Sequence, residues 1–429
     1  MGACCSTECT YKGRRHGKHE SEERDEKDGH GHGRHDDDNN ITSIGHNGAI
    51  IRLQGSSSHT SMYSRKGKKG INQDAMTVWE NFTGEKNVFF CGVFDGHGPS
   101  GHKVAHHVCE ALPLKLSTVH RPQPRHGTKK ESDNEDRHKQ WEADFMRSFK
   151  ELDQDLSMDD SLDSYCSGTT AVTLVKQDHH LIIANLGDSR AILGTRDNNN
   201  QLFPVQLTVD LKPSIPGEAE RIQKNGGRVF AMEEEPNVPR VWMQDQDCPG
   251  LAMSRALGDF CLKDHGLIST PQVFHRRLAS KDEFVVMATD GVWDVLSNNE
   301  VIQIVASVKR LSIAAKVLVY YAVQAWRTKY PGSKVDDCAV VCLFFKKQHH
   351  STSASMSDIS MQTASQIDIP DPDPKGKKTE EGETVINSEI VVDRKMLEEV
   401  NRANAYKRSR LGSSSRHKTS GDSSGGTQS

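Results

Sequence analysis

The chain has 429 residues, of which 34 % are hydrophobic and 27 % are charged, which suits one large domain but leaves too few apolar residues for two. The formal net charge of −4 at pH 7 excludes a global basic field for nucleic acid. The 10 cysteines are scattered, which favours a reducing compartment, and the sequence has neither a secretory signal nor an apolar run of about 20 residues that would span a membrane.

The first residues fit the N-myristoylation pattern, because Gly2 becomes N-terminal when Met1 is removed and Ser6 stands at the required position. One myristoyl chain binds membranes only marginally, so Cys4 and Cys5 are candidates for palmitoylation as a second anchor. The alternative is a chance match in an unstructured tail. We expect an intracellular protein, at the inner membrane surface (the cytoplasmic face of the plasma membrane) if lipidated and otherwise in the cytoplasm or nucleus.

Composition predicts the domain boundaries. Residues 13–40 are low in complexity and cannot form a core, so we expect residues 1–55 to be disordered. Order is predicted to begin near Thr60, within a domain of residues 56–347. Residues 348–429 are rich in Ser, Thr, Asp, Lys and Gly, and are predicted to form a disordered tail.

Apolar runs typical of buried strands lead into an acid at three places, namely Asp95, Asp188 and Asp290. A fourth apolar run, residues 339–345, is instead preceded by acid, at Asp336 and Asp337. If this run is antiparallel to the others, all the acids gather at one rim of the sheet. Carboxylates with water and backbone carbonyls favour Mg²⁺ or Mn²⁺ over Zn²⁺.

The residues at the end of the first of these strands include further candidate catalytic and metal-binding groups. Asp95 is fixed by the strand, Gly96 allows a backbone carbonyl to approach an ion closely, and His97 can transfer a proton near neutral pH. Upstream, residues 66–74 form a basic, glycine-rich turn, whose Lys69 suits a phosphate.

The remaining elements are predicted from apolar periodicity. A helix should follow Ser100 and stop at Pro113, and a second helix should start at Trp141 after a flexible loop over residues 120–140. Residues 210–266 are loop-rich with one helix, as in a substrate-selecting flap. Two more helices are expected, one capped at Asn298 and the other around Ile313.

Seven motifs occur in the order found in type 2C metal-dependent serine/threonine protein phosphatases, and the chain most resembles the plant branch. They are NQD at 72–74, DGHG at 95–98, SGTTA at 167–171, GDSRA at 187–191, SRALGD at 254–259, TDGVWD at 289–294 and DDCAVV at 336–341. The resemblance covers about residues 60 to 347. It implies an α+β fold in which a β-sandwich of two mainly antiparallel sheets is flanked by helices.

The resemblance also implies roles for these residues. Two Mg²⁺ or Mn²⁺ ions would be bridged by Asp95, with Gly96 offering its carbonyl to one ion and Asp290 and Asp336 holding the other. Positions matching Asp74, Asp188 and Asp294 are further metal ligands, the last two holding a weaker third ion in some members. His97 resembles the general acid that protonates the departing seryl or threonyl oxygen of a phosphoprotein substrate.

Two positions depart from the family pattern. Lys69 stands where much of the family has Arg, which keeps the charge but loses the bidentate fork. Gln73 stands where the family usually has Glu, so one ion loses a negative ligand, and we expect weaker affinity for that metal.

Three alternatives remain open. A pseudophosphatase would bind phosphoproteins without turnover, although such a scaffold has no need for Asp95, His97, Asp290 and Asp336 together. A dinuclear nuclease is opposed by the lack of a basic face studded with aromatics, so we expect no nucleic-acid partner. If the chain were a purely structural membrane adaptor, its function would be unaffected by substitution of the metal ligands. We expect the chain to act as a monomer.

Overall fold

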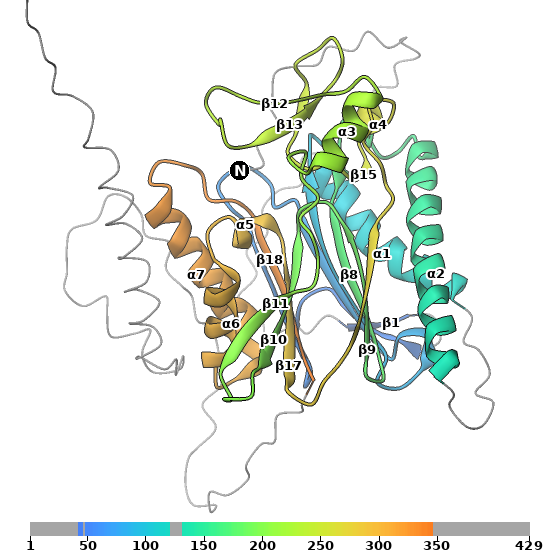
Figure 1. The fold of residues 1–429 in the computed structure, drawn as a ribbon, viewed down its shortest axis with the longest axis vertical. Helices are drawn as coiled ribbons and strands as arrows, with labels where there is room; N and C mark the ends of the chain where they lie inside the picture. The colour runs from blue at the N-terminus through green and yellow to red at the C-terminus, as the bar shows by residue number, and fades with distance from the viewer. Residues whose placement is uncertain (1–41, 46–47, 121–130, 346–429) are drawn as a thin grey trace, which may run out of the picture.

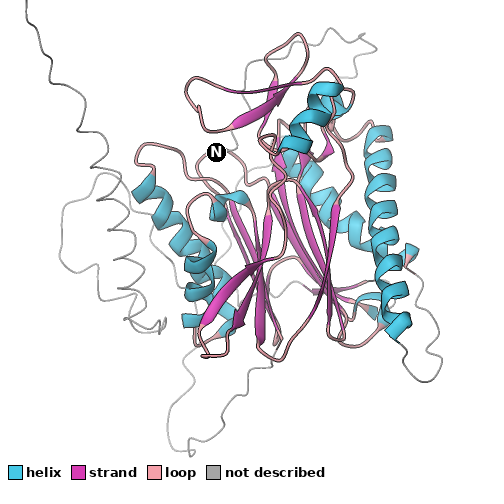
Figure 2. Ribbon diagram, viewed as in Figure 1, coloured by secondary structure: helices cyan, strands magenta, loops and turns pink. Residues whose placement is uncertain are grey.

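The structure is a computed structural model that describes residues 42–45, 48–120 and 131–345. Within these residues two antiparallel sheets pack face to face, and helices cover both outer faces (Figures 1 and 2). The predicted α+β sandwich is therefore confirmed. The described cysteines, from Cys91 to Cys342, form no disulfide.

The larger sheet runs in the order β1-β2-β5-β6-β8-β9-β16, with the short strands β7 and β15 attached beside β6. Its strands are β1 (Thr42–Ile44), β2 (Ile50–Arg52), β5 (Asp74–Glu80), β6 (Phe89–His97), β7 (Gly168–Thr169), β8 (Ala171–Gln177), β9 (His180–Leu186), β15 (Leu257–Gly258) and β16 (Gln272–Arg277). The smaller sheet runs β11-β10-β17-β18-β4-β3. Its strands are β3 (Gly55–Ser56), β4 (Thr60–Arg65), β10 (Arg190–Arg196), β11 (Leu202–Gln206), β17 (Asp282–Ala288) and β18 (Cys338–Phe344).

Helices α1 (Gly101–Val119) and α2 (Glu131–Met158) cover the larger sheet, and α6 (Asn298–Ser307) and α7 (Ala314–Lys329) cover the smaller one. The shorter helices are η2 (Phe82–Gly84), α3 (Pro216–Lys224), α4 (Phe260–Lys263), α5 (Asp290–Trp293) and η3 (Leu311–Ile313).

The alternating direction of side chains along each strand explains how the layers pack. In β6, Phe90 and Phe94 pack against α1 and α2, whereas Cys91 and Val93 pack between the sheets. Successive strand residues point to opposite faces, so a strand covered on both faces is apolar throughout. This is why the runs before Asp95 and Asp290 lack polar residues.

The sandwich begins earlier than predicted. Residues 42–55 were expected to be disordered, but β1, β2 and the first residue of β3 lie there, and β2 pairs with β5 through Ile51 and Trp79. The prediction was wrong because these strands are two or three residues long and too short to show a period. The predicted tail at 348–429 lies outside the described residues.

Two helix boundaries also differ. Pro113 lies inside α1 because Leu112 and Leu116, on either side of it, are both buried against the sheet, and this packing offsets the lost backbone hydrogen bond. The loop predicted over 120–140 is wrong from Glu131 onward, where α2 begins. Residues 131–140 contain no Pro or Gly and include good helix formers, so the helix extends before its apolar stripe.

The cap of α6 is Ser297 rather than Asn298. The Ser297 hydroxyl accepts from the Glu300 backbone N–H at 3.3 Å, while the Glu300 carboxylate accepts from the Ser297 N–H at 2.8 Å. This reciprocal capping box fixes the start of the helix.

The 210–266 segment contains the expected helix, α3, and also a three-stranded sheet that the sequence did not predict. The strands are β12 (Arg228–Ala231), β13 (Pro239–Trp242) and β14 (Pro249–Leu251). Ile222, Val241, Leu251 and Leu262 give this segment its own small core. In Figure 1 α3 and this small sheet stand above the end of the sandwich where α5 lies, and we call residues 210–266 the flap.

Candidate metal centre and active site

The acids at the strand ends meet at one rim of the sandwich. Asp74 pairs with Asp95 in the β5–β6 register, because β5 begins where β6 ends. Strands β17 and β18 are antiparallel, so Asp290, just after β17, and Asp336, just before β18, also share one end. The Thr289 hydroxyl donates to the Asp74 carboxylate at 2.8 Å and thereby joins the two sheets.

Burial and mutual repulsion disfavour negative charge at this rim. Burial, and to a smaller extent the negative charge of Asp290, raises the pKa of Asp95 well above its usual range. Burial, and to a smaller extent the negative charge of Asp337, also raises the pKa of Asp74 well above its usual range. The pKa of Asp336 rises to about 6 through burial and Asp290, against the opposing effect of Lys69. A divalent cation would relieve this repulsion.

A second observation tests whether the rim fits cations. The Oδ1 atom of Asp188 is buried, and no hydrogen-bond partner for it exists among the residues that the structure describes. Its Oδ2 atom lies 3.5 Å from Lys212 Nζ. The negative charge of Asp188 raises the pKa of Lys212 despite its burial, and the charges of Asp294 and Asp290 add to this effect. An oxygen-only donor set with an unsatisfied buried carboxylate oxygen suits a hard divalent ion.

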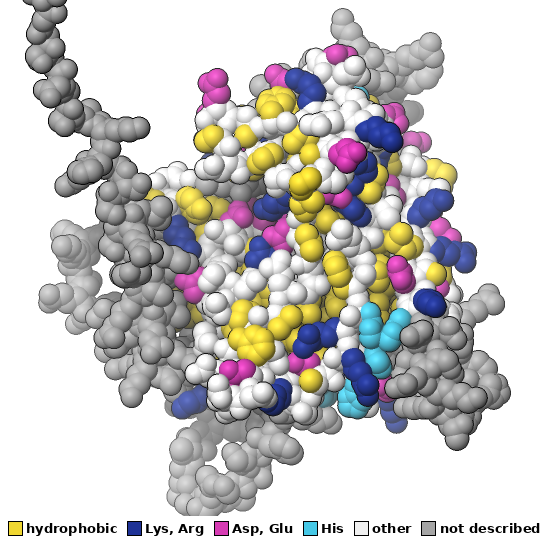
Figure 3. Space-filling model, in the orientation of Figure 1, with side chains coloured by type: hydrophobic (Ala, Val, Ile, Leu, Met, Phe, Trp, Pro, Cys, Tyr) yellow, Lys and Arg dark blue, Asp and Glu magenta, His cyan; other side chains and the backbone are white. Residues whose placement is uncertain are grey.

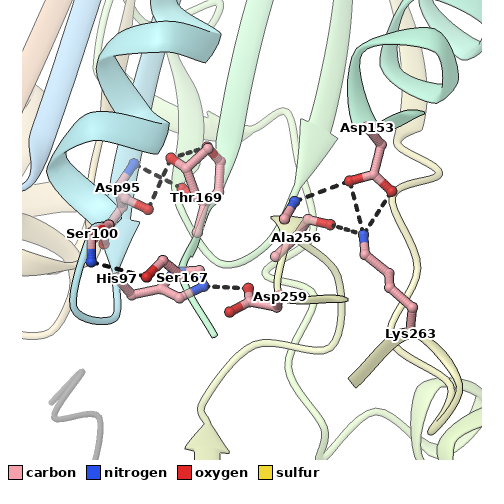
Figure 4. A network of polar contacts seen from close by, with 11 residues as sticks. Asp95, His97, Ser100, Asp153, Ser167, Thr169, Ala256, Asp259 and Lys263 are labelled. Carbon is pink, nitrogen blue, oxygen red and sulfur yellow. Dashed lines mark hydrogen bonds and ion pairs between the residues drawn. The ribbon is translucent and has the colours of Figure 1, made fainter. Parts of the chain in front are cut away.

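The SGTTA segment holds the backbone of Asp95 in place (Figure 4). The Asp95 N–H donates to the Thr170 hydroxyl at 3.1 Å, and the Asp95 carbonyl accepts from the Thr170 N–H at 2.9 Å. The Thr169 hydroxyl donates to the same carbonyl at 3.1 Å. Next in the chain, a Cβ on Gly96 would lie 2.5 Å from the Gly101 carbonyl oxygen, so this turn accepts no side chain.

His97 is paired with an acid that the sequence analysis did not single out. Its Nε2 atom lies 2.6 Å from Asp259 Oδ2, and both side chains are buried (Figure 4). Burial lowers the pKa of His97, but the charge and hydrogen bond of Asp259 raise it more, so the net shift is upward. The only signal for Asp259 was its place in the SRALGD motif.

The basic turn is folded onto the same rim. Lys69 Nζ forms an ion pair with the Asp336 carboxylate. Burial opposes the charge of Lys69, but Asp336 and Asp290 raise its pKa overall. The turn is held by Asp337, an acid that the sequence placed before the last strand without giving it a role, and which accepts from Gly67 N–H at 2.6 Å and from Gln73 N–H at 2.9 Å.

Gln73 also lies at this rim. Its backbone carbonyl accepts from the Gly96 N–H at 3.2 Å, and its side-chain Nε2 donates to the Gly98 carbonyl at 3.1 Å. The amide therefore bridges β5 to the turn after β6, a contact that a carboxylate at this position would not make.

The structure thus brings most of the predicted site residues together at one rim, namely Lys69, Asp74, Asp95, Gly96, His97, Asp290 and Asp336. Asp188 and Asp294 interact electrostatically with Lys212, which also senses the charge of Asp290. The lipidation candidates Gly2, Cys4 and Cys5 lie outside the described residues. Among the helices of the described part of the chain, none has the length and apolar character needed to cross a membrane.

Comparisons with known proteins agree with this arrangement. A profile of the family described as Protein phosphatase 2C matches residues 59–329. "Probable protein phosphatase 2C 65" of Arabidopsis thaliana is 56 % identical over 315 residues, covering 72 % of this chain and 82 % of the relative. "Probable protein phosphatase 2C 73" of Oryza sativa subsp. japonica is 54 % identical over 319 residues, covering 70 % and 76 %.

Solved structures are similar in fold. The serine-threonine phosphatase 2C from Toxoplasma gondii superposes with a TM-score of 0.62 at 25 % identity, covering 70 % of this chain and 99 % of its own. A C. elegans sex determining protein, at 22 % identity and a TM-score of 0.53, covers 69 % of this chain and 66 % of its own, and is similar in fold alone.

Proposed function

Because the chain belongs to the protein phosphatase 2C family, of the plant type, we propose that it hydrolyses phosphoserine and phosphothreonine in proteins at the rim where its buried acids meet. The single observation that carries this proposal is the convergence of Asp95, Asp290 and Asp336 from both sheets beside His97 and Lys69.

We propose that two Mg²⁺ or Mn²⁺ ions bind here. Asp95, the Gly96 carbonyl, Asp74, Asp290 and Asp336 would hold them. When bound, such ions supply Lewis-acid stabilisation of phosphoryl oxygens and lower the pKa of an attacking water. A weaker third ion would use Asp188 and Asp294, where the unsatisfied Asp188 oxygen supports it.

His97 would act as the general acid that protonates the departing seryl or threonyl oxygen. Although burial lowers the pKa of His97, the charge and hydrogen bond of Asp259 raise it overall and so favour the protonated imidazole, and the 2.6 Å contact with Asp259 fixes the ring. Lys69 would bind the phosphate by charge, and the ion pair with Asp336 would then be exchanged for one with the substrate.

The flap stands above the same end of the sandwich and would contact the protein around the phosphorylated residue. Its small core and the ion pairs of Glu218 with Arg255 and Arg221 support a defined surface rather than a loose loop. Release of phosphate from a phosphothreonine peptide tests the function. Absence of turnover from folded protein with either metal would favour the phosphoprotein-binding scaffold.

We further propose that the chain acts close to a membrane in intracellular signalling, anchored by a myristoyl group on Gly2 and palmitoyl groups on Cys4 and Cys5. Gly2→Ala should move the protein out of the membrane fraction of lysed cells, and Cys4→Ser with Cys5→Ser should do so in part. Cys9→Ser, outside the pattern, is the control. Equal membrane association of Gly2→Ala and wild type would contradict the anchor.

A further inference from the structure

Three histidines gather on the surface of the larger sheet, away from the acidic rim. His138 comes from α2, His180 from β9 and His275 from β16, and one ring nitrogen of each lies within 4.8 Å of the corresponding nitrogens of the other two. Histidine side chains cluster at the lower right of the face drawn in Figure 3. Segments far apart in the sequence therefore bring three imidazoles to one point.

The fold explains why these side chains converge. In the β9–β16 register His275 is opposite Ile182 and His180 is opposite Arg277, so the two histidines stand diagonally on one face. Ile182 belongs to the core under α1 and α2, which shows that this is the face covered by helices. His138 lies one turn before Trp141 on α2, so it continues the buried stripe of the helix over the sheet.

The spacing of the nitrogens is close to that of ligands around one metal ion, and the rings also pack on each other, with the His138 and His275 ring centroids 3.3 Å apart. His138 Nε2 lies 3.3 Å from His180 Nδ1, and His180 Nδ1 lies 2.9 Å from His275 Nε2. Tetrahedral Zn²⁺ with Zn–N bonds of about 2.0–2.1 Å holds its nitrogen ligands about 3.3 Å apart. Three imidazoles with one side open to water also match zinc sites that keep a fourth position free.

We propose that His138, His180 and His275 form a transition-metal site, with Zn²⁺ as the ion whose preferred geometry fits best. Imidazole nitrogens favour such borderline ions, in contrast to the oxygen-only rim that suits Mg²⁺ and Mn²⁺. The two sites would therefore select different metals on one chain.

The charges around the cluster are mixed. Arg137 and Arg277 face it, and Asp178 offsets them, with its Oδ2 3.9 Å from Arg137 Nη1. Burial, then His138 and His180, lowers the pKa of His275 to about 4. Burial, then His138 and Arg277, lowers the pKa of His180. Only a neutral imidazole offers the lone pair that binds a metal, so metal binding competes with protonation at these three histidines.

The site is separate from the phosphatase centre. His180 begins β9, whereas the other end of β9, at Leu186, leads to Asp188 at the acidic rim. A metal here would tie the first turns of α2 to the edge strand β16 and stabilise the fold rather than take part in phosphate transfer.

Zinc binding to the full chain tests the proposal by isothermal titration in excess Mg²⁺, which keeps the acidic rim occupied. A background variant with His16, His19, His30, His32, His35, His349, His350 and His417 all changed to Ser removes the competing histidines of both tails. In this background we expect one Zn²⁺ per chain, and His275→Ala and His138→Ala should each weaken binding at least 10-fold. His179→Ala, exposed and adjacent to His180, is the matched control and should bind as before.

Thermal unfolding gives a second readout that does not involve catalysis. Saturating Zn²⁺ should raise the Tm of the background protein by about 4 °C, and His275→Ala should abolish this rise. His275 is exposed on an edge strand, so its substitution leaves the core intact. No Zn²⁺ binding by the background protein, or equal binding by His275→Ala and His179→Ala, would overturn the proposal.

Discussion

The imidazole of His97 and the carboxylate of Asp259 form a buried pair, with Nε2 2.6 Å from Oδ2, although 162 residues separate them in the chain. The pair connects the exit of β6 to the residue just before α4, and Asp259 holds a left-handed backbone conformation with φ 52°. A single contact thus links the proposed general acid to the base of the flap.

Asp259→Asn should lower kcat about 10- to 100-fold near pH 8, because the charge of Asp259 raises the pKa of His97. A raised pKa keeps the proton on His97 to higher pH, so its loss should move the alkaline limb of the pH–rate profile to lower pH. The measurement is kcat against pH on a phosphothreonine peptide with Mn²⁺. Asp264→Asn, exposed at the end of α4, is the control, and an unmoved limb in Asp259→Asn would contradict the role of the pair.

Asp337→Ala should lower the free energy of unfolding by about 2 kcal/mol, because it removes the acceptor of two backbone N–H groups, those of Gly67 and Gln73. It should also raise KM, since these bonds hold the turn that carries Lys69. Urea unfolding and steady-state kinetics measure the two effects. Lys66→Ala, in the same turn, should leave stability within about 0.5 kcal/mol of wild type.

Gln73→Glu should have opposite effects with and without metal. In the metal-free protein the new carboxylate would face the Gly98 carbonyl, which now accepts from the Gln73 amide at 3.1 Å, so Tm should fall. With Mn²⁺ the added negative ligand should lower the metal concentration for half-maximal activity several-fold. An unchanged metal requirement would show that residue 73 does not act on the ion.

Glu218→Gln should destabilise the flap by about 2 kcal/mol at pH 7. Although burial opposes its charge, hydrogen bonds from Arg255, Arg221 and Ser254 lower the pKa of Glu218 to about 2. A depressed carboxyl pKa adds stability above its unfolded value of about 4.3, and this is lost as pH falls toward 2. Urea unfolding at pH 7 and pH 3.5 should show a smaller difference from wild type at the lower pH, and a constant difference would contradict this account.

The sequence predicted the acidic rim because each acid lies within three residues of the end of an apolar run. The position of an acid at a strand end then fixes which edge of the sheet it occupies. Asp95, Asp290 and Asp336 could therefore be identified before their spatial neighbours were known. The pairing of two sheets came from the resemblance to a family, since alternation within a strand does not identify the sheet it joins.

What the sequence did not predict depends on distant contacts. Asp337 supports Gln73 across 264 residues, and His275 meets His180 across 95, so no local pattern signals either. The strands β1 to β3 and the flap sheet are too short for a period to appear. The start of α2 was missed because its first turns carry no apolar stripe.

Phosphate release from a phosphothreonine peptide by the purified full chain tests the central claim most directly, with Mn²⁺, with Mg²⁺ and with chelator, beside Asp290→Asn. Asp290 is buried and raises the pKa values of Asp95 and Asp336, so its substitution removes charge from the centre of the rim. We predict metal-dependent turnover that both chelator and Asp290→Asn abolish. Turnover that survives the chelator, or none from folded wild type with either metal, would contradict a metal-dependent phosphatase.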